Sequence, residues 1–331
     1  MTKLLNIFFF FLIINFSKAQ DVHFSQLNNV PLIINPANTG EYQGYSRFIL
    51  NYRNQWRSIS KNSFETYSFS YDANFFKDKF SSGIYFFKDV AGDGNMSNSQ
   101  INFSLASKVN LNSSNYLKLG LQTAWGQKSV DMSNLTWNSQ YEGSILNSNL
   151  ISGENESILS FNYIDFSSGL LWNCKMNKNS KLNIGFSAYH INRPKYNFLS
   201  DAEKLHIRWN THIDFEIEIP TTNMTIFPSI LFMKQGASNE LNFGGIVKYS
   251  LGNNSRYTGF EKPSSIYLGL FCRNSDALIA YSRFNFRNQI DIALSYDINL
   301  SNFLKFTSAR GGMEIALIYT LERNKTNRKY K

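Results

Sequence analysis

Residues 205–219 alternate between apolar and polar side chains. The odd-numbered positions are Leu205, Ile207, Trp209, Thr211, Ile213, Phe215, Ile217 and Ile219, and the even-numbered ones are His206, Arg208, Asn210, His212, Asp214, Glu216 and Glu218. A period of two is typical of a β-strand whose side chains point to opposite faces. Tilted by about 40°, this stretch climbs ~38 Å, more than the ~25 Å apolar band of an outer-membrane barrel. The pattern therefore predicts a strand with lipid on one face and a wet lumen on the other.

The same alternation predicts thirteen further strands. With 204–219, we place them near 46–57, 63–77, 80–88, 97–111, 115–128, 160–174, 180–191, 223–234, 240–251, 264–273, 276–287, 289–300 and 311–322. The even total is what single-chain bacterial barrels require. Pro228 removes a ladder hydrogen bond and predicts a bulge in its strand. We therefore expect an all-β fold, an antiparallel transmembrane barrel of about 14 strands over residues 46–322.

The connections between these strands differ in length. Residues 77–79, 112–114, 220–222 and 288 are short turns, whereas 129–159 and 192–203 are long and fall on the opposite side. Two connections break the rule, since 252–263 is too long and 274–275 too short for its side. Outer-membrane barrels have short periplasmic turns and long extracellular loops. The first strand is thus predicted to rise from the periplasm.

The N-terminus reads as an export signal. Lys3 supplies a positive charge, residues 4–16 are apolar, and Ser17-Lys18-Ala19 offers small residues for cleavage. Residues 1–19 are therefore expected to be a signal peptide, and the mature chain to begin near Gln20. The alternative is an uncleaved helical anchor, but the run is shorter than the ~20 residues of a membrane span. No cysteine stands near the cleavage site, so a lipid anchor is not expected.

Segments without alternation flank the predicted barrel. Residues 20–45 are rich in turn formers, and residues 323–331 form a basic tail. Two interpretations of the 20–45 leader stay open: a periplasmic tail, or a segment that plugs the lumen or docks a partner. The leader residues that we consider candidates for partner or lumen contact are Phe24, Gln26, Asn35 and Pro36.

Composition supports the barrel. The chain has 29 Phe, 18 Tyr and 5 Trp, and only 17% of its residues are charged, which suits strands with aromatic girdles. The net charge of +9 does not indicate nucleic-acid binding, because the basic strand residues are scattered singly. Lumenal counter-charges and contact with anionic outer-membrane lipid explain it. Cys174 and Cys272 fall on separate predicted strands, so disulfides are not the expected stabilising device.

The polar parity of the strands supplies the remaining candidate sites. Arg53 and Gln55 are expected in the lumen and Trp56 near the end of its strand, as partner contacts. The structural alternative is that a lumenal carboxylate, such as Asp72 on the next strand, neutralises Arg53, and that Trp56 is a girdle aromatic. Other lumenal charges that we consider as partner contacts are Arg208, Asp214 and Glu216.

Metal and catalytic sites are not predicted. Asp89, Gly92, Asp93 and Gly94 lack the full ligand set of a calcium loop and predict a turn. His206 and His212 share a face but lie ~20 Å apart along a strand, too far to bind one metal. The other histidines are His23 and His190, the latter expected at a rim, and no nucleophile–base set accompanies any of them. We expect no enzyme, no metal and no cofactor.

Several blocks in order along the chain resemble the PorP/SprF family. They are Gln20-Asp21, Phe24-Ser25-Gln26, Pro31, Asn35-Pro36-Ala37 and Gly40; Tyr52-Arg53-Asn54-Gln55-Trp56; Tyr67-Ser68-Phe69-Ser70-Tyr71-Asp72; Asp89, Gly92 and Gly94; Gly120-Leu121-Gln122, Gln127 and Asp131; Ser295-Tyr296-Asp297; and Gly311-Gly312-Met313-Glu314-Ile315. The chain departs from the family pattern at Asn38-Thr39 and Arg57-Ser58. These departures affect the identity of the partner.

The resemblance implies an outer-membrane barrel of the type IX secretion system in a Gram-negative cell. Such proteins support export or surface retention of large adhesin-like proteins, often used in gliding, that carry a C-terminal sorting domain. The implied partners are that secreted protein, or its C-terminal domain, and other secretion components. A passive porin is the alternative, and an embedded enzyme that depends on a histidine is a third hypothesis.

Overall fold

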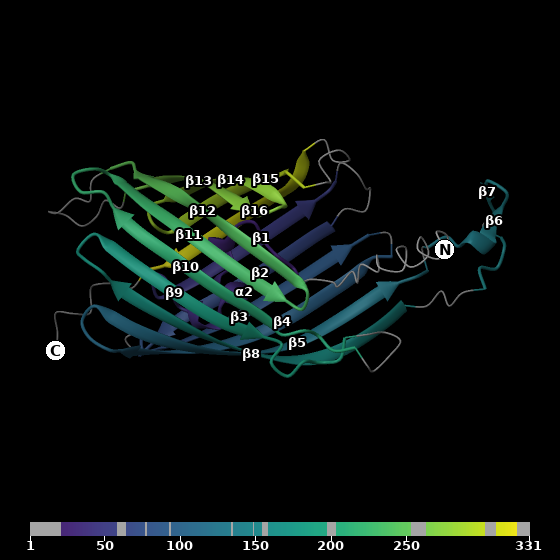
Figure 1. Ribbon diagram of the computed structural model, residues 1–331, viewed down its shortest axis with the longest axis horizontal. Coiled ribbons are helices and arrows are strands. Elements are labelled where there is room, and N and C mark those ends of the chain that lie inside the picture. Colours follow the sequence, from purple (N-terminus) through teal and green to yellow (C-terminus); the bar gives the residue numbers. More distant parts are fainter. Residues whose placement is uncertain are drawn as a thin grey trace, which may run out of the picture.

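Fourteen strands close into one antiparallel barrel in a computed structural model (Figure 1). The structure describes residues 21–57, 64–76, 78–92, 94–133, 135–147, 149–153, 158–196, 203–252, 263–301 and 309–322. The barrel strands are β1 (Ser46–Gln55), β2 (Phe64–Phe75), β3 (Phe80–Ala91), β4 (Met96–Asn110), β5 (Asn115–Asp131), β8 (Ile158–Lys175), β9 (Ser180–Tyr189), β10 (Arg208–Glu218), β11 (Met224–Gln235), β12 (Ser238–Ser250), β13 (Ser265–Arg273), β14 (Ala277–Phe286), β15 (Ile290–Asn299) and β16 (Arg310–Leu321). Each pairs with its sequence neighbours in the barrel, and β1 closes the ring on β16.

The predicted fold class and strand number are confirmed. The largest error in a strand boundary is at β10, which begins at Arg208 instead of 204. The predicted bulge at Pro228 is wrong. Pro228 pairs in register with Gly245 of β12, and the β10–β11 register is the same before and after the proline. Phe227 and Pro228 have no paired residue on β10. The missing proline N–H therefore interrupts the β10–β11 ladder at two positions, without the extra residue that a bulge would insert. A register shift occurs instead between β15 and β16, at Tyr296–Ile298.

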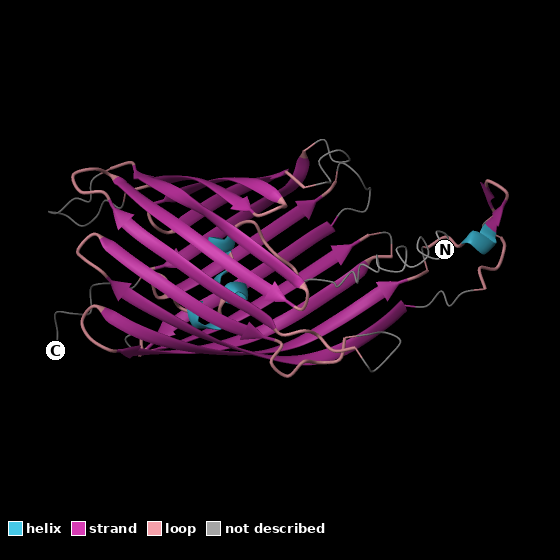
Figure 2. Ribbon diagram, viewed as in Figure 1, coloured by secondary structure: helices cyan, strands magenta, loops and turns pink. Residues whose placement is uncertain are grey.

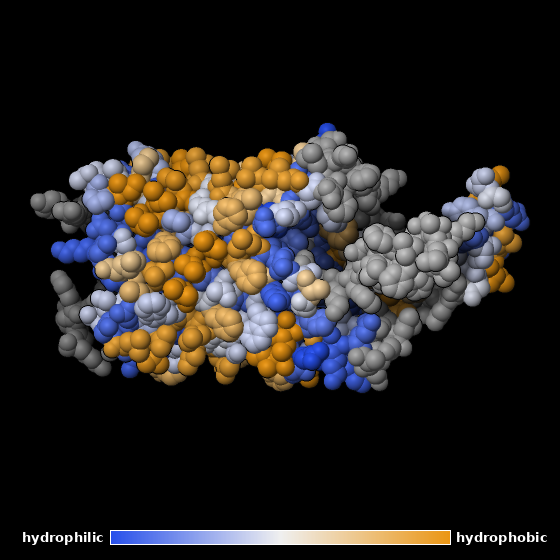
Figure 3. Space-filling view, in the orientation of Figure 1, coloured by the Kyte–Doolittle hydropathy of each residue, from blue (hydrophilic) through white to orange (hydrophobic). Residues whose placement is uncertain are grey.

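The two parities of each strand face opposite environments. On β5, Leu119 and Leu121 point outward and are 57% and 67% exposed, whereas Lys118 and Gln122 point inward and are buried. The space-filling view shows the same division, with apolar residues covering the wall and polar residues gathered towards its ends (Figure 3). An apolar exterior around a polar interior is the arrangement a barrel needs in lipid, where no water can satisfy outward-facing polar groups.

The two ends of the barrel differ. Residues 76–79, 111–114, 176–179, 219–223 and 287–289 make short turns at one end, and β12–β13 (251–264) is the long exception there. The opposite end carries the long connections 132–157 and 190–207, together with the short 92–95, 236–237 and 274–276. Short turns mark the periplasmic end. In the part of the chain that the structure describes, no helix has the length and apolar character to span a membrane.

Three short helical turns of the leader lie inside the barrel (Figure 2). They are η1 (Leu27–Asn29), α2 (Pro31–Ile34) and η2 (Pro36–Asn38). Proline begins both α2 and η2, where its fixed φ suits a helix start and its missing N–H costs nothing. The predicted signal peptide and basic tail lie outside the described residues.

Apolar side chains fill part of the lumen beside the leader. Ile49, Ile246, Phe271, Ile279, Tyr281, Ala293, Ala316 and Ile318 form one buried cluster, with Phe227 and Tyr267 packed against it. A second cluster joins Phe24, Val30 and Ile34 of the leader to Leu231 of β11. The lumen is therefore packed along β11–β16 and β1, and the leader occupies the remaining width.

Candidate functional site

The leader runs down the lumen from the extracellular to the periplasmic end. Its backbone N–H at Asp21 donates to Gln235 Oε1 (3.0 Å), at the last residue of β11 on the long-loop side. Its backbone N–H at Gly40 donates to Asp72 Oδ2 (2.7 Å), near the short turn after β2. Gly40 has φ +73°, a conformation that glycine adopts without strain. The start of the leader thus faces the outside of the cell, and its end passes into β1.

The wall satisfies the carbonyl groups that a short helix leaves unpaired. Leu32 O accepts from Tyr189 Oη (2.9 Å), and Ile33 O accepts from Arg208 Nη2 (3.2 Å). Ile34 O accepts from both Ser187 Oγ (2.7 Å) and Asn210 Nδ2 (2.9 Å). Helix C-termini need such partners when water is excluded. β9 and β10 therefore hold α2 by its last turn.

Two glycines opposite each other in the β5–β8 ladder make room for the leader backbone. Gly120 pairs with Gly169. A Cβ at Gly120 would lie 2.3 Å from the backbone of Pro36 and Ala37, and a Cβ at Gly169 would lie 1.9 Å from Asn35 Oδ1. Asn35 is itself fully buried, donates to Leu170 O (3.0 Å) and accepts from Ala37 N (2.8 Å). We name Gly120 and Gly169 the glycine notch.

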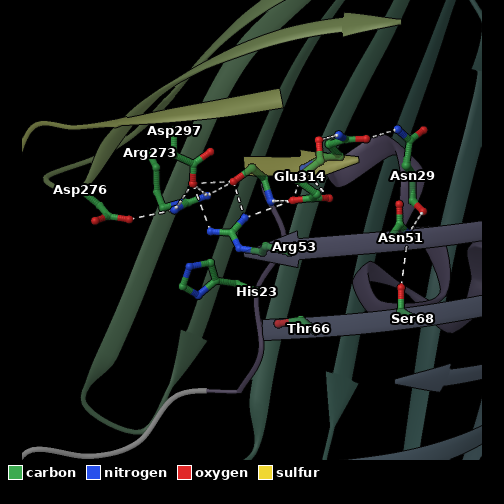
Figure 4. A network of polar contacts seen from close by, with 12 residues as sticks. His23, Asn29, Asn51, Arg53, Thr66, Ser68, Arg273, Asp276, Asp297 and Glu314 are labelled. Atoms are coloured by element: carbon green, nitrogen blue, oxygen red, sulfur yellow. Dashed lines mark hydrogen bonds and ion pairs between the residues drawn. The ribbon is translucent and has the colours of Figure 1, made fainter. Parts of the chain in front are cut away.

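Arg53 lies at the centre of a buried ionic network near the extracellular end (Figure 4). Its Nη1 is 3.1 Å from Glu314 Oε2 on β16, and its Nη2 is 3.1 Å from Asp297 Oδ2 on β15. Arg273 Nη1 lies 3.4 Å from the same Asp297 oxygen. Ser25 of the leader donates to Asp297 Oδ2 (2.7 Å) and accepts from both guanidinium groups. The network thus joins four wall strands (β1, β13, β15 and β16) and the leader.

The leader also forms hydrogen bonds to both the side chain and the main chain of Glu314. Ser25 N donates to Glu314 Oε2 (2.8 Å), and Gln26 Nε2 donates to Glu314 O (2.9 Å). Beside them, burial and the charges of Arg273 and Arg53 hold the pKa of His23 well below its usual range. His23 is therefore neutral at physiological pH and adds no third positive charge to the network.

A second ionic cluster fixes the first described residue of the leader. Asp21 Oδ2 is 2.6 Å from His190 Nε2 and 3.1 Å from Arg208 Nη1, and His190 Nδ1 is 2.9 Å from Asp165 Oδ2. The expected rim position of His190 is wrong: its side chain is buried in the lumen. It follows the last residue of β9 with φ +59°, so the strand parity no longer applies to it. We name this cluster the Asp21 latch.

Both ends of the Asp21–His190 pair are charged at neutral pH. Burial raises the pKa of Asp21, but the positive charges of His190 and Arg208 outweigh it and hold that pKa well below its usual value. Burial lowers the pKa of His190, but Asp21 and Asp165 outweigh it and raise that pKa to about 9. The latch is an ion pair that acid within the physiological range does not break.

Alkali is expected to loosen the latch. His190 has a raised pKa in the folded state, so its contribution is fully present below its unfolded value and lost as pH rises through about 9. A nitroxide at Val22→Cys should gain a mobile EPR component between neutral pH and pH about 10, whereas one at Ile145→Cys, outside the barrel, should not change. In a His190→Gln background the transition should vanish. A spectrum that is flat through pH 9 in the wild-type background would contradict the latch.

The predicted site residues fall into two groups. Phe24, Gln26, Asn35, Pro36, Arg53 and Arg208 are brought together, since they are leader residues or contact the leader directly. Asp214 and Glu216 lie lower in the lumen, where Asp214 Oδ2 is 2.7 Å from His212 Nδ1 and Glu216 is 2.9 Å from Lys181. Gln55 ends β1, and Trp56 packs edge-on against Phe64 with ring centroids 4.9 Å apart.

Lumenal carboxylates do pair with Arg53, as the structural alternative held, but Asp72 is not one of them. In the β1–β2 register Asp72 lies opposite Arg47, and it binds the Arg47 guanidinium with an oxygen–nitrogen distance of 2.8 Å. Arg53 lies opposite Thr66, six residues further along the strand pair, and its carboxylate partners are on β15 and β16. Strand parity correctly predicted that Arg53 points into the lumen, but it could not predict how far along the barrel axis Arg53 lies.

Sequence reasoning did not select the carboxylates that hold Arg53, nor Arg273, Ser25, Asp21, His190 and Asp165. Asp297 and Glu314 occur in the motifs that carry the family resemblance, and Asp297 has the inward parity of β15. An inward charge inside a resembling motif was thus a usable signal. Ser25 and Asp21 also occur in those motifs, but the leader has no periodicity from which their contacts could be predicted.

The free space in the lumen is distributed unevenly around the leader. A cavity of about 610 Å³ opens at the short-turn end, lined by residues that include Lys108, Tyr116 and Lys118. A smaller one of about 190 Å³ lies between it and the leader, against Ile34 and His212. Two cavities on the extracellular side, beside Asp21 and Arg208, measure about 30 Å³ each. The leader and its contacts thus separate a roomy periplasmic vestibule from a closely packed extracellular mouth.

Neither of the metal sites considered from the sequence gains support from the geometry. Gly92 has φ +69° in the β3–β4 turn, and Asp89 accepts a hydrogen bond from Thr66 Oγ1 (2.6 Å). Asp93 lies outside the described residues. Among those described, no group of three or more His, Cys, Asp and Glu residues is arranged to hold a metal ion.

A closed, even-stranded antiparallel barrel with an apolar exterior and a polar interior is an integral outer-membrane β-barrel. A family model, "Type IX secretion system membrane protein PorP/SprF", matches residues 16–319. The chain therefore belongs to the PorP/SprF family of type IX secretion outer-membrane proteins.

Solved structures with a similar barrel include outer-membrane transporters. The Ralstonia pickettii toluene transporter TbuX aligns with a TM-score of 0.51 and 8% identity over 89% of this chain and 94% of that one. The P. putida toluene transporter TodX aligns with a TM-score of 0.47 and 9% identity over 89% and 95%. At such identities the likeness to TbuX shows the fold alone. A comparison with curated protein sequences found no match.

Proposed function

We propose that this protein is a plugged, non-enzymatic scaffold of the type IX secretion system that binds a large adhesin-like protein and helps export or anchor it at the cell surface. Membership of the PorP/SprF family supports the secretion role, and the resemblance implies a partner with a C-terminal sorting domain. The observation that carries the scaffold role is the leader. It runs through the lumen from Asp21 to Gly40 and is held by ionic contacts, backbone hydrogen bonds and a fitted notch.

The packed lumen argues against the alternative of a passive porin. Porin lumens are water-filled channels. Here Arg53, Glu314 and Asp297 are almost fully buried although they face the lumen, because the leader covers them. A scaffold needs a rigid wall and exposed loops, and a closed lumen prevents leakage while a large partner is held.

Loss of the protein is expected to release one class of secreted protein. In the native bacterium, deleting the gene should leave one or a few large sorting-domain proteins absent from the surface and present in the medium or periplasm. Other type IX cargo should remain in place, and re-expression should restore the surface pool. Quantitative mass spectrometry of shaved surface peptides against culture medium measures this. An unchanged surface proteome would refute the scaffold role.

Conductance separates the scaffold from the porin. The purified protein in a planar bilayer should show no steady current, whereas a general porin prepared in the same detergent should conduct. Steady ion flow through the intact, correctly folded chain would establish the porin alternative instead. The measurement does not depend on knowing the partner.

A further inference from the structure

The described residues between β5 and β8 (132–133, 135–147 and 149–153), which we name the extracellular arm, project from the barrel. The described part holds η3 (Asn138–Gln140) and a two-stranded hairpin of β6 (Tyr141–Glu142) and β7 (Ile145–Leu146). In Figure 1 this hairpin lies well beyond the rim of the wall, at the long-loop end. It is therefore placed on the extracellular side and clear of the lipid band.

The arm has a defined internal structure. Asn147 N donates to Gln140 O (2.9 Å), and Ser139 Oγ donates to Ser152 O (2.6 Å). Gly143, with φ +66°, forms the hairpin turn. Two residue pairs make a very small sheet, however, and an isolated hairpin in water is marginal. The hairpin is therefore preformed but marginally stable, and a surface packed against it would stabilise it.

Apolar side chains on the arm are open to water. Ile151 is 90% exposed and Ile145 is 74% exposed, with Tyr141 and Leu146 beside them at 42% each. The equally exposed side chains of the barrel wall are covered by lipid, but those of the arm lie outside the membrane. A group of exposed apolar residues on a soluble surface marks an interaction site.

The arm is also acidic in a basic chain. The connection that carries the arm, residues 132–157, contains Glu142, Glu154 and Glu156 and no lysine or arginine, although the whole chain carries +9. This charge is repelled by anionic lipid head groups and complements a basic protein surface. Among the described residues β6 and β7 pair only with each other, so each has an outer edge at which an extended segment can pair as an added strand.

We propose that the extracellular arm docks a basic β-strand of the secreted surface protein, by edge pairing with the hairpin and burial of Ile145 and Ile151. This inference rests on the proposed function. It specifies the chemistry of the partner segment, which is extended, alternates lysine or arginine with apolar residues, and is received outside the cell.

Peptides test the chemistry directly. Against the full-length protein in neutral detergent, a labelled peptide of about 10 alternating Lys and Val residues is the probe, and its Glu–Val counterpart is the control. The Lys–Val peptide should bind, Ile145→Ser with Ile151→Ser should weaken it about tenfold or more, and Ile191→Ser, an exposed apolar change in another extracellular connection, should not. Equal binding of the Glu–Val peptide, no effect of the arm variant, or dimerisation of the protein through the arm would overturn the proposal.

A test in cells separates failure of the arm from failure of the scaffold. An arm deletion joining residues 132 and 157 by a Gly-Ser linker leaves the Asp131–Ile158 strand pair intact, so the barrel should fold and stay heat-modifiable on gels. It should shed the same surface proteins as the gene deletion. If the gene deletion sheds them and the arm deletion retains them, the arm proposal fails and the scaffold stands. If neither sheds them, the scaffold itself fails.

Discussion

Removing leader residues 21–40 is expected to turn a silent barrel into an ion-conducting one. The deletion withdraws the chain that separates the periplasmic vestibule of about 610 Å³ from the extracellular mouth. The wall should survive, since all fourteen strands keep their ladder and Arg53 keeps both Asp297 and Glu314. In planar bilayers the intact chain should show no resolvable current and the leaderless chain a steady one.

Single substitutions in the glycine notch should produce the same change without shortening the chain. A leucine at Gly120 or Gly169 would occupy the space of Asn35, Pro36 and Ala37, while leucine is well tolerated in a strand. The matched control is Gly245→Ala on β12, a strand glycine where an added Cβ meets nothing closer than 3.6 Å. If the leaderless and notch variants fold, as judged by heat-modifiable mobility, and stay silent, wall side chains alone close the lumen and the leader is not the plug.

The barrel could be predicted because its cause is local. The period-two alternation within each strand predicts which side chains face lipid and which face the lumen. In β5, for example, the apolar Leu119 faces lipid and the neighbouring Lys118 faces the lumen. Loop lengths added the orientation, although 251–264 and 274–276 break the rule in the structure as they do in the sequence, and 92–95 and 236–237 are short turns at the same end as 274–276. Boundaries moved where alternation continued past the last ladder bond, as at Leu205 to Ile207 before β10.

The site could be predicted only in part. It depends on how far along the barrel axis each side chain lies and on the closure of the barrel between β1 and β16. Arg53 was correctly placed in the lumen, but its partner Glu314 lies 261 residues away and meets it only when β1 pairs with β16. His190 was misplaced because one residue with positive φ reverses the parity. The leader has no periodicity. Alternation therefore could not predict that Asn35 lies in the glycine notch or that Ser25 bonds to Asp297.

Replacing Arg53 with methionine is expected to cause the largest loss of stability of any single change in the lumen. The side chain is 2% exposed and neutralises Asp297 and Glu314, which are equally buried. Methionine keeps the apolar stem and leaves two carboxylates with less compensation in a water-poor site. Breaking a buried pair this way costs about 3–5 kcal/mol. Denaturant unfolding in detergent, followed by tryptophan fluorescence, should show the lowered midpoint, and Ser25 should lose its order with it.

Two companion variants distinguish charge imbalance from lost packing. Adding Glu314→Gln to Arg53→Met removes one orphaned charge, so the double variant should recover part of the loss; two independent losses would simply add. Lys181→Met breaks the Lys181–Glu216 pair, whose members are 35% and 31% exposed, and should cost less than about 1 kcal/mol because water screens it. A loss at Arg53 no larger than at Lys181 would mean that water reaches the network. Since the leader is what excludes water there, that result would count against the plug as well as the ion pairs.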